Sequence, residues 1–479
     1  MARGRTARGS RAAVALLLLV APACTIGVRR EETPRASRTP AAPVSVPPCR
    51  TTYAAPDPDR PRITLTFDVD PSYARVTGTE RVVFTPDAPV RDVVFRLWAN
   101  GPGPVAHGGR IEVTSASLPM AFEQAGAGRG TQGTLLRLAL PAESPAGKAI
   151  TVDLAFTLTL PRAEVDRWGH TAQTAWWASA HPMLAWVRGR GWDTTPAVGI
   201  LGETAANETA RYDVTVVAPF GDTVFGIAIP DEPVATAEGK RRWRFVNDVA
   251  RDVAVTVGRF TTRTREVGGV PARFAVSDEL ATGTRAERIL DDVVTDTVRS
   301  METFTRLFGS YPYESLTVVA LDSIRGAGVE YPAFFWVGSR RYDVVVPHEL
   351  AHLWFYGLVG NDQGDHPWLD ESFASYAEGL VNRASGDEFV ATASAGGAVG
   401  RPMSHWDEDE ENYGRLVYAK GGGMLLVSRA EVGAAAFDKM LRCYVNKNAH
   451  RVATPEDVRT AFAPAPVVVD ILRDAGALP

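Results

Sequence analysis

Two histidines four residues apart, with a glutamate directly after the first, constrain the fold of this 479-residue chain more than any other feature. His348, Glu349 and His352 form an H-E-x-x-H motif, which follows the strand-like run VVV and Pro347 and opens an apolar helical pattern, LAHLWFYGLVG. On a helix, residues four apart share a face, so both imidazole rings can reach one metal ion. Glu349 lies about 100° round the helix from His348, which places it beside a metal-activated water rather than among the ligands. Imidazole nitrogen suits zinc, and Glu349 is the candidate general base.

A third protein ligand should come from another element, because catalytic zinc usually has three protein ligands and one open position. Glu371 lies in a second helical pattern, Trp368 to Ala374, and eighteen residues separate it from His352. That distance is enough for a turn and a return to the first helix. The spacing therefore predicts one Zn²⁺ ion held by His348, His352 and Glu371. The alternative, a helix with surface histidines and a solvated glutamate, is disfavoured by the spaced Glu371.

The residue pattern changes character near residue 280. From residue 62 to 277, runs of alternating apolar residues such as RITLTFDVD and RYDVTVVAP are separated by Gly, Pro and Asp clusters. These runs predict an antiparallel β domain. After residue 282, apolar residues recur at helical spacing as far as Gly309, which suits a helix end, and a short strand LTVVALD follows. Helical patterns then continue to the end, and one of them has a capped start at Thr454. We therefore expect an α+β fold, with a β domain at 62–277 and a mainly helical unit at 278–479.

The amino terminus has the pattern of an export signal. Four arginines within the first eleven residues precede the apolar run AAVALLLLV, and the small residues APA follow. The run is too short to span a bilayer, so it predicts a signal peptide at residues 1–23. Cys24, directly after it, resembles the acylated cysteine of a bacterial lipoprotein; the alternative is a secreted protein with an incidental cysteine. Residues 24–61 are rich in Pro, Ala, Ser, Thr and Arg and predict a low-complexity tether.

Composition excludes several classes of protein. Hydrophobic residues make up 45% and charged residues 22% of the chain, values that exclude global disorder. A net charge of −5 and a pI of about 6.0 argue against a nucleic-acid binder with a basic surface. Three cysteines are too few for a disulfide-stapled scaffold or a four-cysteine zinc site. Cys49 and Cys443 can pair in an oxidising compartment if they lie close together, which the sequence does not show.

Two further segments flank the H-E-x-x-H region. GAGVEYP at 326–332 precedes it, and YAKG at 418–421 follows Glu371. The four motifs in this order resemble those of the M1 zinc aminopeptidases, which have a G-x-M-E-N strand and a downstream Y-x-K-G motif. Val329 stands in place of the family's methionine, and Tyr413 matches a second tyrosine of some members. The resemblance covers about residues 62–465 and implies a β domain followed by a thermolysin-like catalytic domain.

The resemblance also implies a role for each matched residue. Glu349 would take a proton from the zinc-activated water and pass it to the leaving amine. The Tyr418 hydroxyl would stabilise the developing oxyanion, and Glu330 would bind the free α-amino group of the substrate. Tyr413 is expected to contact the substrate. A β-domain group that helps to bind the amine is not identified, although three residues are available there: Gln173, Glu203 and Glu208.

The sequence thus predicts an exported zinc metallopeptidase, an aminopeptidase that hydrolyses amino-terminal residues from peptides. Its expected partners are peptide substrates, with no nucleic acid. A lipid at Cys24 would anchor the chain outside the cytoplasm at the cell membrane, and without it the chain would be secreted. Two alternatives stay open: a zinc hydrolase of this fold acting on a non-peptide substrate, and a non-catalytic peptide-binding surface lipoprotein. An endopeptidase is disfavoured, because the charge of Glu330 should block a continuing chain. The oligomeric state is not predicted.

Overall fold

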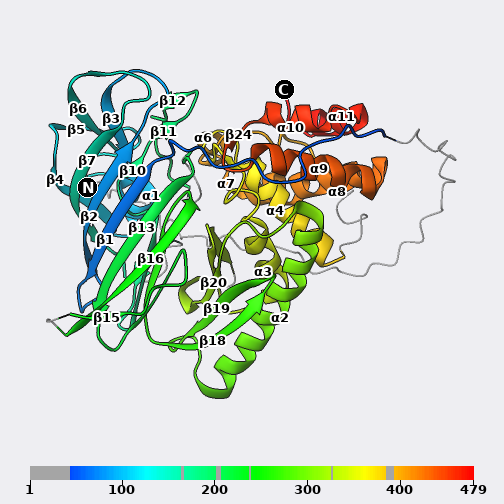
Figure 1. Cartoon of the computed structure of the whole chain (residues 1–479). Coiled ribbons are helices and arrows are strands. Elements are labelled where there is room, and N and C mark those ends of the chain that lie inside the picture. The colour runs from blue at the N-terminus through cyan, green and yellow to red at the C-terminus, as the bar shows by residue number, and fades with distance from the viewer. Residues whose placement is uncertain (1–43, 163–166, 201–205, 237–238, 325–326, 384–392) are drawn as a thin grey trace, which may run out of the picture.

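The computed structural model describes residues 44–479, apart from 163–166, 201–205, 237–238, 325–326 and 384–392. The expected signal peptide and Cys24 lie outside the described residues. A group of β-sheets, a five-stranded sheet carrying one long helix, and a set of packed helices follow one another along the chain (Figure 1). The predicted α+β class is therefore confirmed.

A seven-stranded sheet is the largest element of the β domain. In spatial order its strands are β15 (Val234–Ala235), β16 (Lys240–Ala250), β13 (Ala210–Pro219), β1 (Arg62–Val69), β2 (Arg75–Phe84), β7 (Ile150–Thr159) and β4 (Arg110–Ala116). Neighbouring strands are antiparallel except for β1 and β13, which run parallel. Buried residues alternate with more exposed ones along β1, β2 and β13, as in a sheet with one face toward solvent.

Two smaller sheets cover the apolar face of the seven-stranded sheet. The first contains β10 (Met183–Leu184), β3 (Val90–Arg96), β6 (Leu135–Ser144) and β5 (Met120–Glu123). The second contains β14 (Thr223–Gly226), β17 (Ala254–Gly258), β9 (Thr174–Ala178) and β8 (Trp168–His170). Short elements complete the domain: η1 (Trp98–Asn100), α1 (Pro102–Ala106), β11 (Trp186–Val187) and β12 (Gly191–Trp192). Phe67, Phe95 and Trp177 from the three sheets meet in one core cluster.

A five-stranded sheet lies between the β domain and the helices. Its strands in spatial order are β18 (Phe260–Val267), β19 (Val270–Ser277), β20 (Leu316–Ala320), β22 (Phe334–Val337) and β21 (Gly328–Tyr331). Tyr331 and Trp336 belong to the core of the β domain, whereas Phe335 and Val337 belong to the core of the helices. The β18–β19 hairpin pairs with β20, so the hydrogen bonding favours a domain boundary near residue 259; the predicted boundary at 277 stays a prediction.

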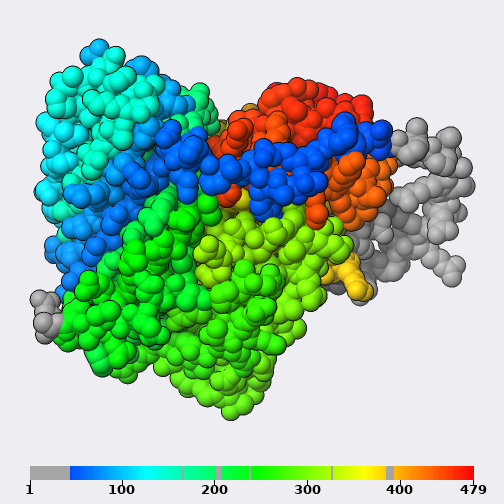
Figure 2. All heavy atoms as spheres, viewed as in Figure 1, coloured from blue at the N-terminus to red at the C-terminus, as the bar shows by residue number. Residues whose placement is uncertain are grey.

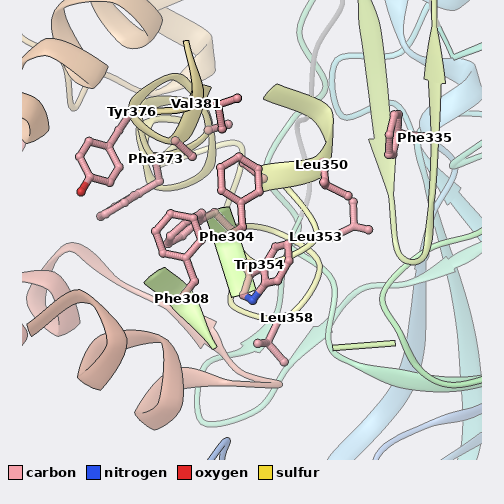
Figure 3. Packing of buried hydrophobic residues seen from close by; sticks show 14 of the residues in the cluster. Phe304, Phe308, Phe335, Leu350, Leu353, Trp354, Leu358, Phe373, Tyr376 and Val381 are labelled. Atoms are coloured by element: carbon pink, nitrogen blue, oxygen red, sulfur yellow. The ribbon is translucent and has the colours of Figure 1, made fainter. Parts of the chain in front are cut away.

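The helices pack around an aromatic core. They are α2 (Gly283–Phe308), α3 (Tyr342–Ala351), α4 (Trp368–Val381), α6 (Met403–Trp406), α7 (Glu410–Tyr413), α8 (Gly421–Val432), α9 (Ala434–Asn448), α10 (Pro455–Phe462) and α11 (Pro466–Asp474). Further short elements are η2 (Asp322–Ile324), the π-helical η3 (Gly414–Lys420), β23 (Gly360–Asn361) and β24 (Val452–Ala453). Figure 3 shows Phe304 and Phe308 of α2 against Trp354, beside Phe373 of α4. The described helices include none with the length and apolar character needed to cross a bilayer.

An N-terminal strap, residues 44–54, crosses the surface of the helical part (Figure 2). A disulfide joins Cys49 to Cys443 of α9, with the two Cα atoms 5.6 Å apart. The side-chain amide of Asn446 donates a hydrogen bond to the carbonyl of Arg50 at 2.7 Å, and the ring of Tyr53 packs on the helical core. Residues 44–54, which belong to the predicted low-complexity tether at 24–61, are therefore fastened to the helical part.

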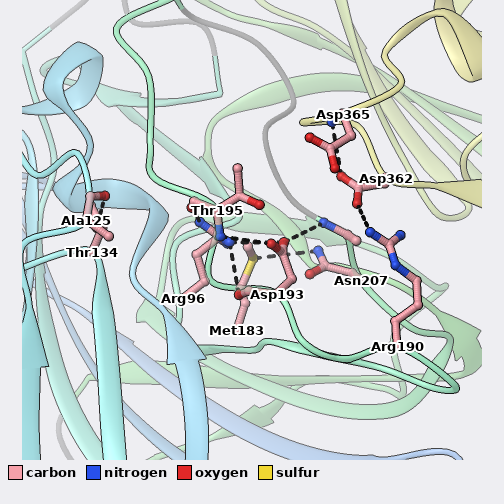
Figure 4. A network of polar contacts seen from close by, with 11 residues as sticks. Arg96, Ala125, Thr134, Met183, Arg190, Asp193, Thr195, Asn207, Asp362 and Asp365 are labelled. Carbon is pink, nitrogen blue, oxygen red and sulfur yellow. Dashed lines mark hydrogen bonds and ion pairs between the residues drawn. The ribbon is translucent and has the colours of Figure 1, made fainter. Parts of the chain in front are cut away.

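Polar side chains join the β domain to the turns that follow α3. Arg190 forms an ion pair with Asp362 at 2.7 Å (Figure 4). The buried guanidinium of Arg251 donates to the carbonyls of Gly357 at 3.1 Å, Leu358 at 3.2 Å and Arg451 at 2.8 Å. These bonds fix the end of α3 relative to the β domain.

Candidate metal centre

The H-E-x-x-H motif lies at the C-terminal end of α3, not at the start of a helix as the sequence pattern indicated. Pro347 lies inside this helix, which ends at Ala351. The apolar run after it forms turns, because Tyr356 has a φ of 114°, which no helix allows. His352 keeps helical dihedral angles (φ −60°, ψ −18°), so the rings of His348 and His352 still share a face, with centroids 4.9 Å apart.

Glu371 on α4 faces both histidines. Its Oε2 lies 3.1 Å from Nε2 of His348 and 3.4 Å from Nε2 of His352. The candidate ligand atoms of the three residues all lie within 4.8 Å of one another, and all three side chains are buried. The structure therefore brings together the three metal ligands predicted from the sequence.

The two other acidic residues of the prediction lie beside this group. Potential ligand atoms of Glu330, Glu349 and His352 also lie within 4.8 Å of one another, and both glutamates are buried. Glu330 comes from β21, at the edge of the five-stranded sheet. The carboxyl of Glu349 packs on the backbone of β21, so closely that a Cβ on Gly328 would lie 2.4 Å from its Oε1.

An oxygen atom lies close to the second ring nitrogen of each histidine. Nδ1 of His348 lies 3.4 Å from Oε2 of Glu378, and Nδ1 of His352 lies 3.2 Å from the carbonyl oxygen of Phe355. Such partners orient an imidazole so that Nε2 faces the metal. Sequence reasoning missed Glu378, although it lies seven residues after Glu371, a spacing that returns to the same face of a helix.

Four carboxylates, Glu330, Glu349, Glu371 and Glu378, face the two imidazole rings. Within this group of six side chains, four carboxylates outnumber the two positive charges that the rings carry when both are protonated, so a cation would be attracted to them. Burial raises the pKa of Glu371, but the rings of His352 and His348 lower it by more, so this group is a carboxylate at neutral pH. Two imidazole nitrogens and one carboxylate oxygen form a common donor set of catalytic zinc, and a dication would offset the charge. The residues present therefore fit a zinc ion.

Tyr418 reaches the same cluster from η3. Its hydroxyl donates a hydrogen bond to Oε1 of Glu371 at 2.6 Å, and its ring stacks on His348 with centroids 5.6 Å apart. Tyr413 is buried behind it, with its ring 5.5 Å from that of Tyr418 and 5.8 Å from that of Trp406. Single π-helical turns frequently mark functional sites. The roles assigned to both tyrosines stay predictions.

Among the β-domain groups considered for amine binding, Glu208 is described and does not belong to this cluster. Gln173 is exposed in the turn before β9, and Glu203 lies outside the described residues. Glu208 accepts a hydrogen bond from the backbone amide of Arg188. The potential metal-ligand clusters of the described residues contain neither Glu208 nor any residue outside the predicted five.

The sequence of this chain is similar to those of M1 peptidases. Residues 294–471 match the domain of peptidase family M1. Aminopeptidase M1-A of Oryza sativa subsp. japonica is 32% identical over 139 residues, which cover 26% of this chain and 16% of the plant protein. Aminopeptidase N of Lactobacillus helveticus is 33% identical over 138 residues, covering 25% of this chain and 16% of the bacterial protein. The chain thus spans about a sixth of the length of these curated relatives.

The fold also matches solved structures over most of its length. The M1 zinc metallopeptidase of Deinococcus radiodurans has a TM-score of 0.65 at 19% identity, covering 88% of this chain and 95% of that chain. A variant of that enzyme bound to the substrate Tyr-Ser-Ala matches equally well, with a TM-score of 0.65 and 87% of this chain covered. At this identity the likeness shows a shared fold.

Proposed function

We propose that this chain, whose residues 294–471 match the domain of peptidase family M1, is a zinc-dependent aminopeptidase. The observation that carries the proposal is the buried group of five side chains. His348, His352 and Glu371 gather on one side, and Glu330 and Glu349 lie within 4.8 Å of His352 on the other. Zinc bound by the first three would supply Lewis-acid activation of a carbonyl group and of water.

Glu349 is placed to move the proton. Its carboxyl is buried beside the three candidate ligands and is not one of them, which suits the role of a base. It would accept a proton from the attacking water and deliver it to the nitrogen of the leaving amine. The close packing of this carboxyl on Gly328 fixes its position relative to β21.

Glu330 gives the site its preference for a free amino terminus. A buried carboxylate binds an ammonium group through a charge-assisted hydrogen bond. An acetylated amino group or a continuing chain offers no such charge and would leave Glu330 buried beside a neutral amide. Aminopeptidases are also the named activity of the relatives with similar sequence. Peptides with a free amino terminus are therefore the proposed substrates.

The proposal is tested with matched peptides that have free and acetylated amino termini. We expect the zinc-loaded wild type to release the first residue of the free peptide only. Glu349→Gln, which keeps the size of the side chain, should bind zinc normally and lose at least ~10²-fold in rate. Equal cleavage of both peptides would show an endopeptidase. Zinc binding without cleavage of either peptide would favour a non-peptide substrate or a binding role.

We further infer that the chain is exported. The disulfide between Cys49 and Cys443 supports this, because such bonds persist in oxidising compartments. The signal-like residues 1–23 and the lipid-anchor pattern at Cys24 add to it, and both lie outside the described residues. Mass spectrometry of the mature protein tests both parts. An acylated Cys24 at the amino terminus is the expected result; an intact Met1 would overturn export, and an unmodified Cys24 would leave a secreted protein.

A further inference from the structure

A buried polar cluster in the β domain lies against the strand that carries Glu330. His181 is at its centre, with Nδ1 3.2 Å from Oε1 of Glu80 and Nε2 3.9 Å from Oδ1 of Asp252. All three side chains are at most 2% exposed. Glu80 occupies an inward-facing position of β2, between the buried Gly78 and Val82, where apolar side chains are the rule. Three ionisable groups in a β-domain core are costly to bury.

The cluster continues to Tyr331 through hydrogen bonds. The hydroxyl of Ser179 donates to Oδ2 of Asp252 and lies 3.4 Å from the hydroxyl of Tyr331. Arg167 donates to the same tyrosine hydroxyl at 3.3 Å. Ser179 has a φ of 49°, which non-glycine residues rarely adopt and which the surrounding structure must hold in place. A continuous polar path therefore runs from Glu80 to Tyr331.

Burial and mutual charge shift the pKa of all three ionisable groups of the cluster. Burial lowers the pKa of His181, but the carboxylates of Glu80 and Asp252 raise it by more, so it lies above its ordinary value. Burial also raises the pKa of the Glu80 and Asp252 carboxyls, although the charge of His181 opposes that shift. The ring of Tyr212 closes the cluster, with its centroid 5.9 Å from that of His181.

Tyr331 connects this cluster to the candidate active site. It follows Glu330 directly on β21, and neighbouring residues of a strand point to opposite faces. Tyr331 packs in the β-domain core, whereas Glu330 faces Glu349 and His352. β21 is four residues long and lies at the edge of its sheet, where the described strands offer it β22 as its one pairing partner. A short edge strand needs support from its faces to hold one position.

We propose that His181, with Glu80 and Asp252, forms a positioning cluster that fixes β21 through the Tyr331 hydroxyl and so sets the place of Glu330 for the substrate's amino group. The inference rests on the proposed function for its effect on peptides. Its structural part, that the β domain holds β21, does not depend on activity.

The first test is Tyr331→Phe, which removes one hydroxyl and keeps the ring. Its matched control is Tyr311→Phe, which removes another buried hydroxyl, one that donates to the carbonyl of Ser315 in the helical part at 3.0 Å. For free-amine peptides, we expect Tyr331→Phe to raise KM by about 3-fold to 10-fold, which is the effect of losing one buried hydrogen bond. The kcat of the variant should stay within about 2-fold of the wild-type value. KM of the control should equal that of the wild type.

The second test asks whether His181 acts through Tyr331. His181→Gln should raise KM in the same way, and the double variant His181→Gln/Tyr331→Phe should be no worse than the more affected single variant, since coupled residues are not additive. Hydrogen exchange of the amides of residues 328–337 should be faster in both single variants than in Tyr311→Phe.

Three outcomes decide the proposal. Faster exchange in β21 together with raised KM supports it. Unchanged exchange, or faster exchange with unchanged KM, overturns the positioning role. If the wild type cleaves no peptide, the proposed function fails separately, and unchanged exchange in Tyr331→Phe would still overturn the link between the β domain and β21.

Discussion

At the scale of single residues, close packing sets the geometry of the candidate centre. The Glu349 carboxyl rests on Gly328, and Glu371 uses one oxygen toward the histidines and the other toward Tyr418. Each of these carboxyl groups has a fixed neighbour. A small substitution at one of these contacts should therefore lower activity or metal affinity without unfolding the protein.

Gly328→Ala tests the contact between β21 and the proposed base. The added Cβ would lie 2.4 Å from Oε1 of Glu349, a distance that real Cβ atoms do not show, so the carboxyl must move. Displacement of a catalytic group by ~1 Å can cost about 10²-fold in rate. We expect kcat/KM for a free-amine peptide to fall by roughly that factor, with zinc retained. Gly221→Ala, where the Cβ meets open space, is the control, and equal activity of both variants would contradict the predicted contact.

Glu378→Gln tests the support of His348. The substitution removes the negative charge 3.4 Å from Nδ1 and weakens the orientation of the ring. Loss of such a partner typically lowers metal affinity by about 10-fold to 100-fold. A competition titration with a zinc chelator measures this affinity. The exposed Glu410→Gln serves as control, and the same zinc affinity in both variants would show that Glu378 does not support the site.

Glu208→Gln tests the effect of a buried carboxyl on stability. Burial raises the pKa of Glu208 from 4.5 to about 7, so its contribution to stability is present below pH 4.5 and is lost as the pH rises through 7. Each pKa unit between the unfolded and folded values changes the free energy of unfolding by about 1.4 kcal/mol, so the whole effect is roughly 3 kcal/mol. The variant should therefore unfold at a higher temperature than the wild type at pH 8, but not at pH 4.5. The exposed Glu232→Gln should show no difference at either pH. A stabilisation of Glu208→Gln that is equal at both pH values would contradict the assigned pKa.

At the scale of elements, the sequence predicted what depends on local spacing and missed what depends on distant contacts. The helix ending at Gly309 and the capped start at Thr454 are confirmed, because periodicity and capping are local signals. The predicted start of the helix that carries the zinc motif was wrong, because the run VVV before Pro347 resembles the end of a strand. In the structure this run lies inside α3, which begins at Tyr342. The pairing of Cys49 with Cys443 stayed open at the level of sequence, because 394 residues separate the two cysteines.

Cys49→Ser tests the fastening of the strap. A disulfide that closes so long a segment restricts the unfolded chain. Its loss typically lowers the free energy of unfolding by about 2–5 kcal/mol, a large share of the roughly 5–15 kcal/mol that is usual for a native protein. We expect a lower Tm for the variant than for the oxidised wild type. A reducing agent should lower the Tm of the wild type to that of the variant and leave the variant unchanged. If the reducing agent left the Tm of the wild type unchanged, that result would contradict a strap held by this disulfide.

At the scale of the whole molecule, the candidate centre depends on three layers that must fit together. The helices carry His348, His352 and Glu371, the five-stranded sheet carries Glu330, and the β domain holds the far face of that sheet through Tyr331. The motifs predicted the five central residues and the α+β class. They could not predict Glu378 or the His181 cluster, because these act through contacts that arise only when the layers pack.

The zinc content of the purified protein tests the central claim most directly. After dialysis against zinc-free buffer, metal analysis of the wild type should give about one zinc ion per chain, as a three-ligand protein site requires. Glu371→Gln should lose most of its zinc, whereas Glu349→Gln should retain it, because Glu371 is a proposed ligand and Glu349 is not. A wild type without zinc, or equal zinc in the wild type and Glu371→Gln, would contradict the account.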